Sequence, residues 1–253
     1  MSFDFHVIIP ARYESTRLPG KLLLELEGET VIERVYKQVL KAKPKSIIIA
    51  TDSSKIAEHA SEFGARVMMT SASHLTGTDR IAEVIAKEQF LVDDIIVNVQ
   101  GDEPLIAPEL IVQVATSLHH SPNPMATLCW PIEQPEQIEN PNVVKLVRDC
   151  NNNALYFSRN PIPAHRDDPK SIAHLFRHIG LYAYRAAFVL DYVTWPVCEL
   201  EACEALEQLR VLWAGYKIRV EQACTEPLQD INTWDDLILA RKLLRKTKAS
   251  NQT

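Results

Sequence analysis

The first hundred residues alternate short apolar runs with longer stretches in which apolar residues repeat at helical spacing. The run Phe5–Pro10 predicts a buried strand, and an amphipathic helix follows over 31–40. Strands are then expected over 46–50, 66–69 and 94–99, and helices over 53–63 and 80–90. Because strand and helix alternate four times, the pattern predicts an α/β fold with a mostly parallel, doubly wound sheet covered on both faces. Ligands bind such sheets at the carboxyl ends of the strands.

The second half of the chain lacks this alternation. Several prolines lie between Ser121 and Pro169, and because proline fixes φ and has no N–H, irregular connections and edge strands are expected there. A strand is expected over 179–184, and helices over 204–214 and about 233–246. No internal repeat is visible, so we expect one domain over residues 1–253 with an elaborated second half.

Capping patterns indicate where three of the helices begin. Thr30 and Glu33 have the spacing of a capping box, and Thr78 or Asp79 is a suitable N-cap for the helix after Met69. Thr233, with an aspartate three residues later, indicates the start of the last helix.

Charge and cysteine content exclude several classes of protein. The 253 residues include 27 Lys and Arg against 33 Asp and Glu, so a net charge of -6 argues against a general binder of nucleic acid or anionic lipid. The longest apolar runs are strand-sized and no basic segment with an apolar stretch opens the chain, so we expect a cytoplasmic protein without membrane insertion. Five scattered cysteines form neither a disulfide framework nor a zinc motif.

A basic loop follows the first predicted strand. Arg12, Arg17 and Lys21 lie within ten residues, at the end of the strand where a doubly wound sheet binds ligands. These cations and the backbone N–H groups of the loop could hold a polyphosphate, although a Walker A motif is absent. The alternative is a solvated basic loop without a ligand.

Two more segments occupy the carboxyl ends of predicted strands. Gln100-Gly101-Asp102-Glu103 carries a carboxylate pair beside a glycine, and Asp102 is the candidate ligand for Mg²⁺. The alternative is a turn in which Asp102 bonds its own backbone. In the segment 74–80, the small pair Thr76-Gly77 could let a base lie against backbone amides, or these residues could serve only as a helix start.

Six segments together resemble a known family. They are Ile9–Lys21, His74–Arg80, Asn98–Pro104, Tyr156–Pro163, Arg177–Arg185 and Leu206–Arg210. In this order they are similar to the 3-deoxy-manno-octulosonate cytidylyltransferases, the CMP-KDO synthetases of Gram-negative bacteria. The resemblance implies a GT-A-like nucleotidyltransferase fold, CTP and KDO as substrates, Mg²⁺ as cofactor, and a homodimer. It also implies CMP-KDO and pyrophosphate as products, for lipopolysaccharide assembly.

The resemblance also implies a role for each matching residue. Arg12, Arg17 and Lys21 would hold the CTP phosphates and act in catalysis, and Asp102 would bind the metal. The nucleotide pocket would be lined by Ala11, Thr76, Gly77 and Arg80, and the sugar-acid site by Gln100, Arg159, His178, Tyr184, Glu207 and Gln208. Without the resemblance, His178 would be interpreted as a core histidine and Glu207-Gln208 as a solvated helix face. The implied regions are a nucleotide-binding part over about 1–120 and a sugar-binding and dimerisation part over about 121–230.

One position departs from the family pattern. The second carboxylate ligand expected before the last helix appears as Asn232, which can coordinate through its carbonyl oxygen but carries no charge. Asp230 or Asp235 could share the metal.

A cytidylyltransferase for another sugar acid, such as sialic acid, and a catalytically silent CTP-binding protein remain alternatives. A Rossmann oxidoreductase is disfavoured because G-x-G-x-x-G is absent after the first strand.

Overall fold

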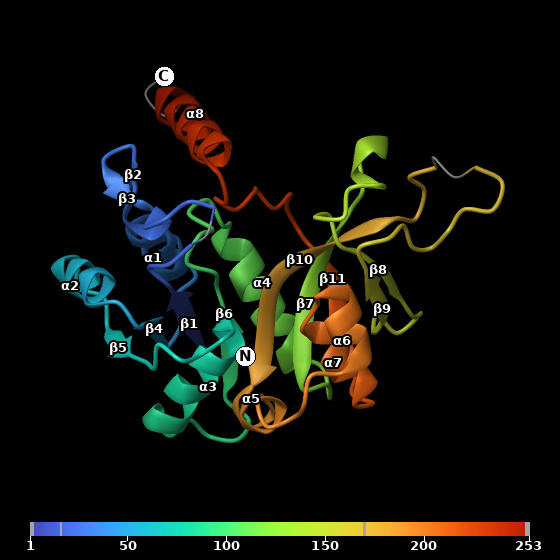
Figure 1. Ribbon diagram of the computed structural model, residues 1–253, viewed down its shortest axis with the longest axis horizontal. Coiled ribbons are helices and arrows are strands. Elements are labelled where there is room, and N and C mark those ends of the chain that lie inside the picture. Colours follow the sequence, from blue (N-terminus) through green and yellow to red (C-terminus); the bar gives the residue numbers. More distant parts are fainter. Residues whose placement is uncertain (1–2, 16, 169–170, 251–253) are drawn as a thin grey trace.

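A single mixed sheet runs through the centre of the protein (Figure 1). The computed structural model describes residues 3–15, 17–168 and 171–250, with side chains as far as residue 246. Within those residues the sheet has nine strands, seven of them in the order β11 (Ile218–Gln222), β7 (Met125–Pro131), β10 (Phe176–Arg185), β6 (Ile95–Asn98), β1 (Phe5–Ala11), β4 (Ser46–Thr51) and β5 (Val67–Met69). The remaining two, β8 (Lys145–Arg148) and β9 (Ala154–Ser158), extend from β10.

Along the seven-strand order four of the six neighbouring pairs are parallel, while β8 adds antiparallel pairs with β10 and β9. β1 pairs in parallel with β4 and β6, β4 with β5, and β11 with β7, whereas β10 is antiparallel to both β6 and β7. The predicted mostly parallel α/β sheet is therefore confirmed.

The helices lie on both faces of the sheet and in its connections. Those of the first half are α1 (Val31–Lys41), α2 (Ser54–Glu62), α3 (Gly77–Glu88) and α4 (Pro108–His119). Those of the second half are α5 (Ala186–Tyr192), α6 (Glu199–Glu204), α7 (Gln208–Trp213) and α8 (Trp234–Ser250). Smaller elements are the 3-10 turns η1 (Lys21–Leu23) and η2 (Pro135–Gln137) and the hairpin of β2 (Glu25–Leu26) and β3 (Glu29–Thr30).

Two hydrophobic cores sandwich the sheet. Successive residues of a strand point to opposite faces, so in β1 the side chains of Val7 and Ile9 enter one core and that of Ile8 enters the other. Helices α1, α2 and α4 contribute to the first core, and α3, α5 and α7 to the second. Every residue of β1 is buried, which explains its continuous apolar run.

Two helices differ in extent from expectation, and at a third only half of the expected capping box forms. α3 begins at Gly77 rather than Arg80 because Thr76 is the N-cap and Asp79 closes the capping box. At α1 the Glu33 N–H donates to the Thr30 hydroxyl, but the Glu33 carboxylate pairs with Lys37. The helix expected over 204–214 is two short helices, because Ala205 adopts a left-handed conformation with φ of 50°.

The proline-rich stretch contains more regular structure than expected. β7 is a central strand, and it is possible there because Pro122 and Pro124 precede it and Pro131 ends it. The prolines therefore flank this strand and do not interrupt its hydrogen bonds.

The C-terminal helix packs on the β2–β3 hairpin, and the segment just before it reaches the loop after β6. α8 starts one residue after Thr233, which forms the predicted capping contacts with Asp236, and runs to Ser250. Arg241 donates to the Glu25 carbonyl at 2.7 Å, so α8 packs against the β2–β3 hairpin. Before the helix, the Ile231 N–H donates to the Asp102 carbonyl at 2.9 Å. None of the helices in the described part of the chain is long and apolar enough to cross a bilayer.

Candidate active site

Three segments meet at the carboxyl end of β1. A Cβ atom on Gly101 would lie 3.0 Å from the Pro10 carbonyl oxygen, and one on Gly77 would lie 3.5 Å from the Pro10 ring. Glycine at 101 is therefore required because the loop after β6 passes directly against the end of β1. These contacts place the basic loop, the start of α3 and the carboxylate segment side by side.

The basic loop folds back on itself before Lys21. The Gly20 N–H donates to the Tyr13 carbonyl at 3.2 Å, and Gly20 has φ of 66°, a conformation that favours glycine. Leu18 is fully buried and anchors the loop, while Thr16 lies outside the described residues. The loop therefore directs Lys21 towards the end of β6.

Lys21 lies between the two candidate metal ligands. Its Nζ is 2.5 Å from Asp102 Oδ2 and 3.2 Å from Asn232 Oδ1, and it also donates to the Ile231 carbonyl at 2.9 Å. Arg17 donates to the same Asn232 oxygen at 2.9 Å. The structure thus brings together four of the predicted site residues, from three distant parts of the chain.

Two further carboxyl groups surround this cluster. Asn232 donates from Nδ2 to Asp230 Oδ2 at 2.5 Å. Burial, followed by the charge of Asp102, raises the pKa of Asp230, and the same two causes with the charge of Asp230 raise the pKa of Glu103 to about 8. The cluster therefore concentrates acidic oxygens around the Lys21 ammonium.

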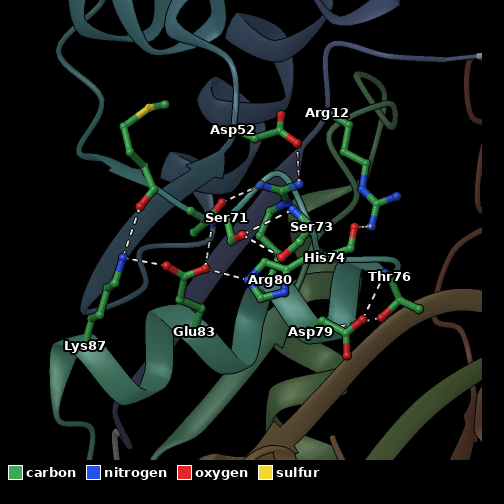
Figure 2. Close-up of polar contacts among 12 residues, drawn as sticks. Arg12, Asp52, Ser71, Ser73, His74, Thr76, Asp79, Arg80, Glu83 and Lys87 are labelled. Atoms are coloured by element: carbon green, nitrogen blue, oxygen red, sulfur yellow. Dashed lines mark hydrogen bonds and ion pairs between the residues drawn. The ribbon is translucent and has the colours of Figure 1, made fainter.

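The predicted nucleotide residues on α3 have mostly structural contacts (Figure 2). The Thr76 hydroxyl accepts from the Asp79 N–H at 3.1 Å, and the Thr76 N–H donates to the Asp79 carboxylate at 3.0 Å. Arg80 is fully buried; it donates to Asp52 Oδ2 at 2.7 Å and to the Thr70 hydroxyl. Direct contact of Arg80 with a nucleotide is not supported by this geometry, because the guanidinium has no exposed surface.

Arg12 and Ala11 lie beside this region. Ala11 is the buried last residue of β1, and the Arg12 guanidinium donates to the His74 carbonyl at 3.1 Å. Arg12 is therefore held on the α3 side of β1, whereas Arg17 and Lys21 face the β6 side.

A cavity of about 310 Å³ lies next to the cluster, between α3, β6, β10 and α7. Five predicted residues line it, namely Gly77, Gln100, Tyr184, Glu207 and Gln208. The same cavity is lined by Thr78, Asn98 and Tyr182, which sequence reasoning missed. Asn98 had a usable signal, since it is a polar residue in an otherwise apolar strand, and Tyr182 shares a strand face with Tyr184.

The cavity wall combines polar and apolar side chains, and some of its polar groups lack hydrogen-bond partners. The Thr78 hydroxyl donates to Glu207 Oε2 at 2.9 Å, and burial raises the pKa of the Glu207 carboxyl and of the Tyr184 phenol. Among the described residues, Asn98 Oδ1 and Gln208 Nε2 are buried without a hydrogen-bond partner. Because such groups are costly unless they are bonded, the cavity suits a ligand rich in hydroxyl groups.

Comparison with known proteins identifies the family. A family model described as Cytidylyltransferase matches residues 6–218. The chain belongs to the cytidylyltransferase family. Relatives named 3-deoxy-manno-octulosonate cytidylyltransferase include that of Legionella pneumophila (strain Lens), 63% identical over 98% of this chain and 99% of its own. That of Francisella philomiragia is 51% identical over 95% and 98%.

Solved structures agree with the family. A CMP:2-keto-3-deoxy-manno-octonic acid synthetase complexed with CTP has a TM-score of 0.90 and 36% identity, covering 97% of this chain and 100% of that one. A 4-diphosphocytidyl-2C-methyl-D-erythritol synthase shares the fold, with a TM-score of 0.65 at 13% identity over 96% and 99% of the two chains. The nucleotidyltransferase fold expected from the resemblance is confirmed.

Two predicted sugar-site residues of this cytidylyltransferase-family chain lie outside the cavity lining. Arg159 donates from Nε to the Glu204 carbonyl at 2.6 Å and from Nη2 to the Ala205 carbonyl at 3.2 Å, so it fixes the turn before α7. His178 Nε2 is 3.1 Å from the Thr127 hydroxyl, and its ring packs edge-on to Phe157. Burial lowers the pKa of His178 to about 3, so the imidazole is neutral at pH 7, and its ring lies 5.2 Å from the ring of Tyr182, which lines the cavity.

Proposed function

We propose that this chain transfers the cytidylyl group of CTP to KDO and releases pyrophosphate. The observation that carries this proposal is the continuity of two sites. The cationic cluster around Lys21 and the cavity share the short segment that begins at Gln100 and ends at Asp102, so a triphosphate held at one side has its α-phosphorus near a sugar held at the other. The names of the relatives supply the two substrates.

In the reaction, a hydroxyl oxygen of the sugar acid forms a bond to the α-phosphorus of CTP. The bond from that phosphorus to the oxygen of the departing pyrophosphate breaks, and the hydroxyl proton passes to solvent. Arg12, Arg17 and Lys21 hold the phosphate oxygens and stabilise the negative charge that develops on them. The protein contributes mainly by positioning the two substrates, because the attacking hydroxyl belongs to the sugar.

The cavity residues orient the sugar acid. Of the four buried side-chain atoms without partners in the described residues, Gln208 Nε2 and Asn98 Oδ1 belong to residues that line the cavity; after side-chain reorientation, Gln208 Nε2 donates to a sugar oxygen and Asn98 Oδ1 accepts from a hydroxyl. Arg159 acts one step further away, by holding the turn that includes Ala205 at the cavity wall.

Mg²⁺ is the cofactor we propose. The residues fit it, since Asp102 and Asn232 direct hard oxygens at one point that already attracts the Lys21 ammonium. No group of three His, Cys, Asp or Glu side chains suited to a metal occurs within the described residues. Mg²⁺ commonly binds through one or two carboxylates together with substrate phosphates and water, so a smaller protein donor set suffices. When bound, it supplies charge neutralisation at the triphosphate.

A pyrophosphate-release assay tests the function. With CTP, Mg²⁺ and KDO we expect rapid pyrophosphate formation, and little with N-acetylneuraminate or with other nucleoside triphosphates. Turnover with N-acetylneuraminate in place of KDO would assign another acceptor to the same chemistry. CTP binding by calorimetry, without pyrophosphate from any acceptor, would indicate a silent nucleotide-binding protein.

We also propose that the product enters lipopolysaccharide biosynthesis and that the protein acts in the cytoplasm as a homodimer. The relatives' sugar substrate supports the first statement. Light scattering coupled to gel filtration tests the last, with an expected mass twice that of the chain.

A further inference from the structure

One side of α3 holds the loop between β5 and α3, residues 70–76 (Figure 2). Arg80, Glu83 and Lys87 follow one another at spacings of three and four residues, so they share that side of the helix. Arg80 donates to the Thr70 hydroxyl, and Lys87 donates to the Met69 carbonyl at 3.3 Å. The loop is therefore attached along the length of the helix and not only at the Thr76 cap.

Glu83 is the centre of these contacts. Its Oε2 accepts from the Ser71 N–H at 2.8 Å and lies 2.5 Å from His74 Nε2, while its Oε1 pairs with Lys87 at 2.5 Å. Partial burial raises the pKa of Glu83, but hydrogen bonds from Lys87, Ser71 and His74 outweigh it and bring the pKa to about 2. Glu83 is consequently a carboxylate at neutral pH, and charge-assisted hydrogen bonds of this kind are the stronger ones.

The loop that Glu83 holds is the support of Arg12. The His74 carbonyl accepts from the Arg12 guanidinium at 3.1 Å, while the ring of the same residue is held by Glu83. A chain of contacts thus runs from α3 through His74 to the first cation after β1. The Glu83 carboxylate itself makes its contacts with the loop and with Lys87, on the far side of His74 from Arg12.

We propose that Glu83 is a positioning residue, which sets the direction of the Arg12 guanidinium towards the CTP triphosphate by fixing His74. The inference rests on the proposed function, because Arg12 needs a phosphate to bind. It assigns to α3 a role in the nucleotide site that the buried Arg80 does not supply by direct contact.

A double-mutant cycle on CTP affinity tests the inference. Glu83→Gln keeps the size of the side chain and removes its charge, and we expect it to weaken CTP binding, measured by calorimetry, about fivefold to tenfold. In an Arg12→Ala background the same change should alter affinity less than about twofold, because the residue through which Glu83 acts is gone. The KM for KDO should stay within about twofold of the wild-type value.

Glu88→Gln is the matched control. Glu88 lies on the same helix and pairs with Arg66 at 2.6 Å, away from the loop, so this variant should leave CTP affinity within about twofold of wild type. His74→Ala gives a second route, which cuts the ring contact with Glu83 but keeps the backbone carbonyl. Its effect should have the same direction and should not add to that of Glu83→Gln.

An equal loss of affinity from Glu83→Gln with and without Arg12 would overturn the positioning role, as would unchanged affinity in a folded Glu83→Gln protein. If the wild-type chain bound CTP and released pyrophosphate while the cycle showed no coupling, only this inference would fail. If the wild-type chain bound no CTP, both the proposed function and this inference would fail.

Discussion

Replacing Asp102 with asparagine separates the catalytic and structural roles of the carboxylate cluster. Asp102→Asn keeps the shape of the side chain but removes its charge, so the Lys21 ammonium loses its ionic partner at 2.5 Å and keeps the carbonyl of Ile231 and the oxygen of Asn232. The proposed metal ligand becomes neutral in the same step. We expect a large loss of turnover in a protein that remains folded.

The magnitude follows from two opposing effects on stability. Breaking a buried ion pair by removing one partner costs about 3 to 5 kcal/mol, and this pair is only partly buried, with side chains 12% and 21% exposed, so the cost is smaller. Asp102 also repels Asp230, whose pKa is raised by burial and then by the charge of Asp102, and its neutralisation relieves that repulsion. The net loss should therefore be below about 2 kcal/mol, a small part of the usual stability of about 5 to 15 kcal/mol.

The catalytic effect should be larger. Removing one preorganised group that stabilises developing charge costs about 3 to 4 kcal/mol, which corresponds to a loss of about a hundredfold to a thousandfold in kcat. Pyrophosphate release at saturating CTP, KDO and Mg²⁺ measures it, and far-UV circular dichroism checks the fold. Asp93→Asn is the control, since Asp93 is an exposed aspartate paired with Arg185 at 3.5 Å. Retention of more than about a tenth of the wild-type kcat would refute the ligand role of Asp102.

Three other substitutions test the fold and the cavity. Gly101→Ala places a methyl group 3.0 Å from the Pro10 carbonyl and should lower stability by about 1 to 3 kcal/mol in urea unfolding, whereas Gly180→Ala, with open space around it, should not. His178 has an ordinary pKa of 6.5 when unfolded and about 3 when folded, so the unfolded chain binds more protons between these values and stability falls as the pH is lowered. From pH 7.5 to 5.0, the wild type should lose about 2 kcal/mol more than His178→Gln, and equal losses would show that the folded histidine titrates normally. Gln208→Leu removes a buried nitrogen without a partner among the described residues, so thermal unfolding should show unchanged or higher stability while the KM for KDO rises about tenfold or more; an unchanged KM would place Gln208 outside the sugar site.

The sequence predicts the first half of the fold well because its signals are local. In β1, β4 and β6, apolar runs of strand length are buried on both faces, and the helices between them repeat at 3.6 residues. The break at Ala205 had no such signal, because a left-handed residue is usually glycine and here it is alanine. It follows from the surrounding packing, which includes the Arg159 side chain on the carbonyl of Ala205.

The site shows the same division between local and distant causes. Lys21 and Asp102 could be predicted to meet, because both follow parallel strands that end at the same edge of the sheet. The burial of Arg80 could not be predicted from the sequence, because it depends on a contact with Asp52, a distant residue that follows β4. The contact of His178 with Thr127 could not be predicted either, because Thr127 lies in β7, a strand that the proline content obscures; the substrate role of His178 stays a prediction.

The asparagine at 232 also has a physical explanation in this arrangement. Its amide has two different ends, and both are used, since Oδ1 accepts from Arg17 and Lys21 while Nδ2 donates to Asp230 at 2.5 Å. An aspartate there would place two carboxylates at hydrogen-bond distance, and like charges so close cannot both be ionised. Asn232 therefore still presents an oxygen to Arg17 and Lys21, and Asp230 supplies the second carboxyl group beside it. The number of negative charges near Lys21 therefore depends on residues 230 and 232 together.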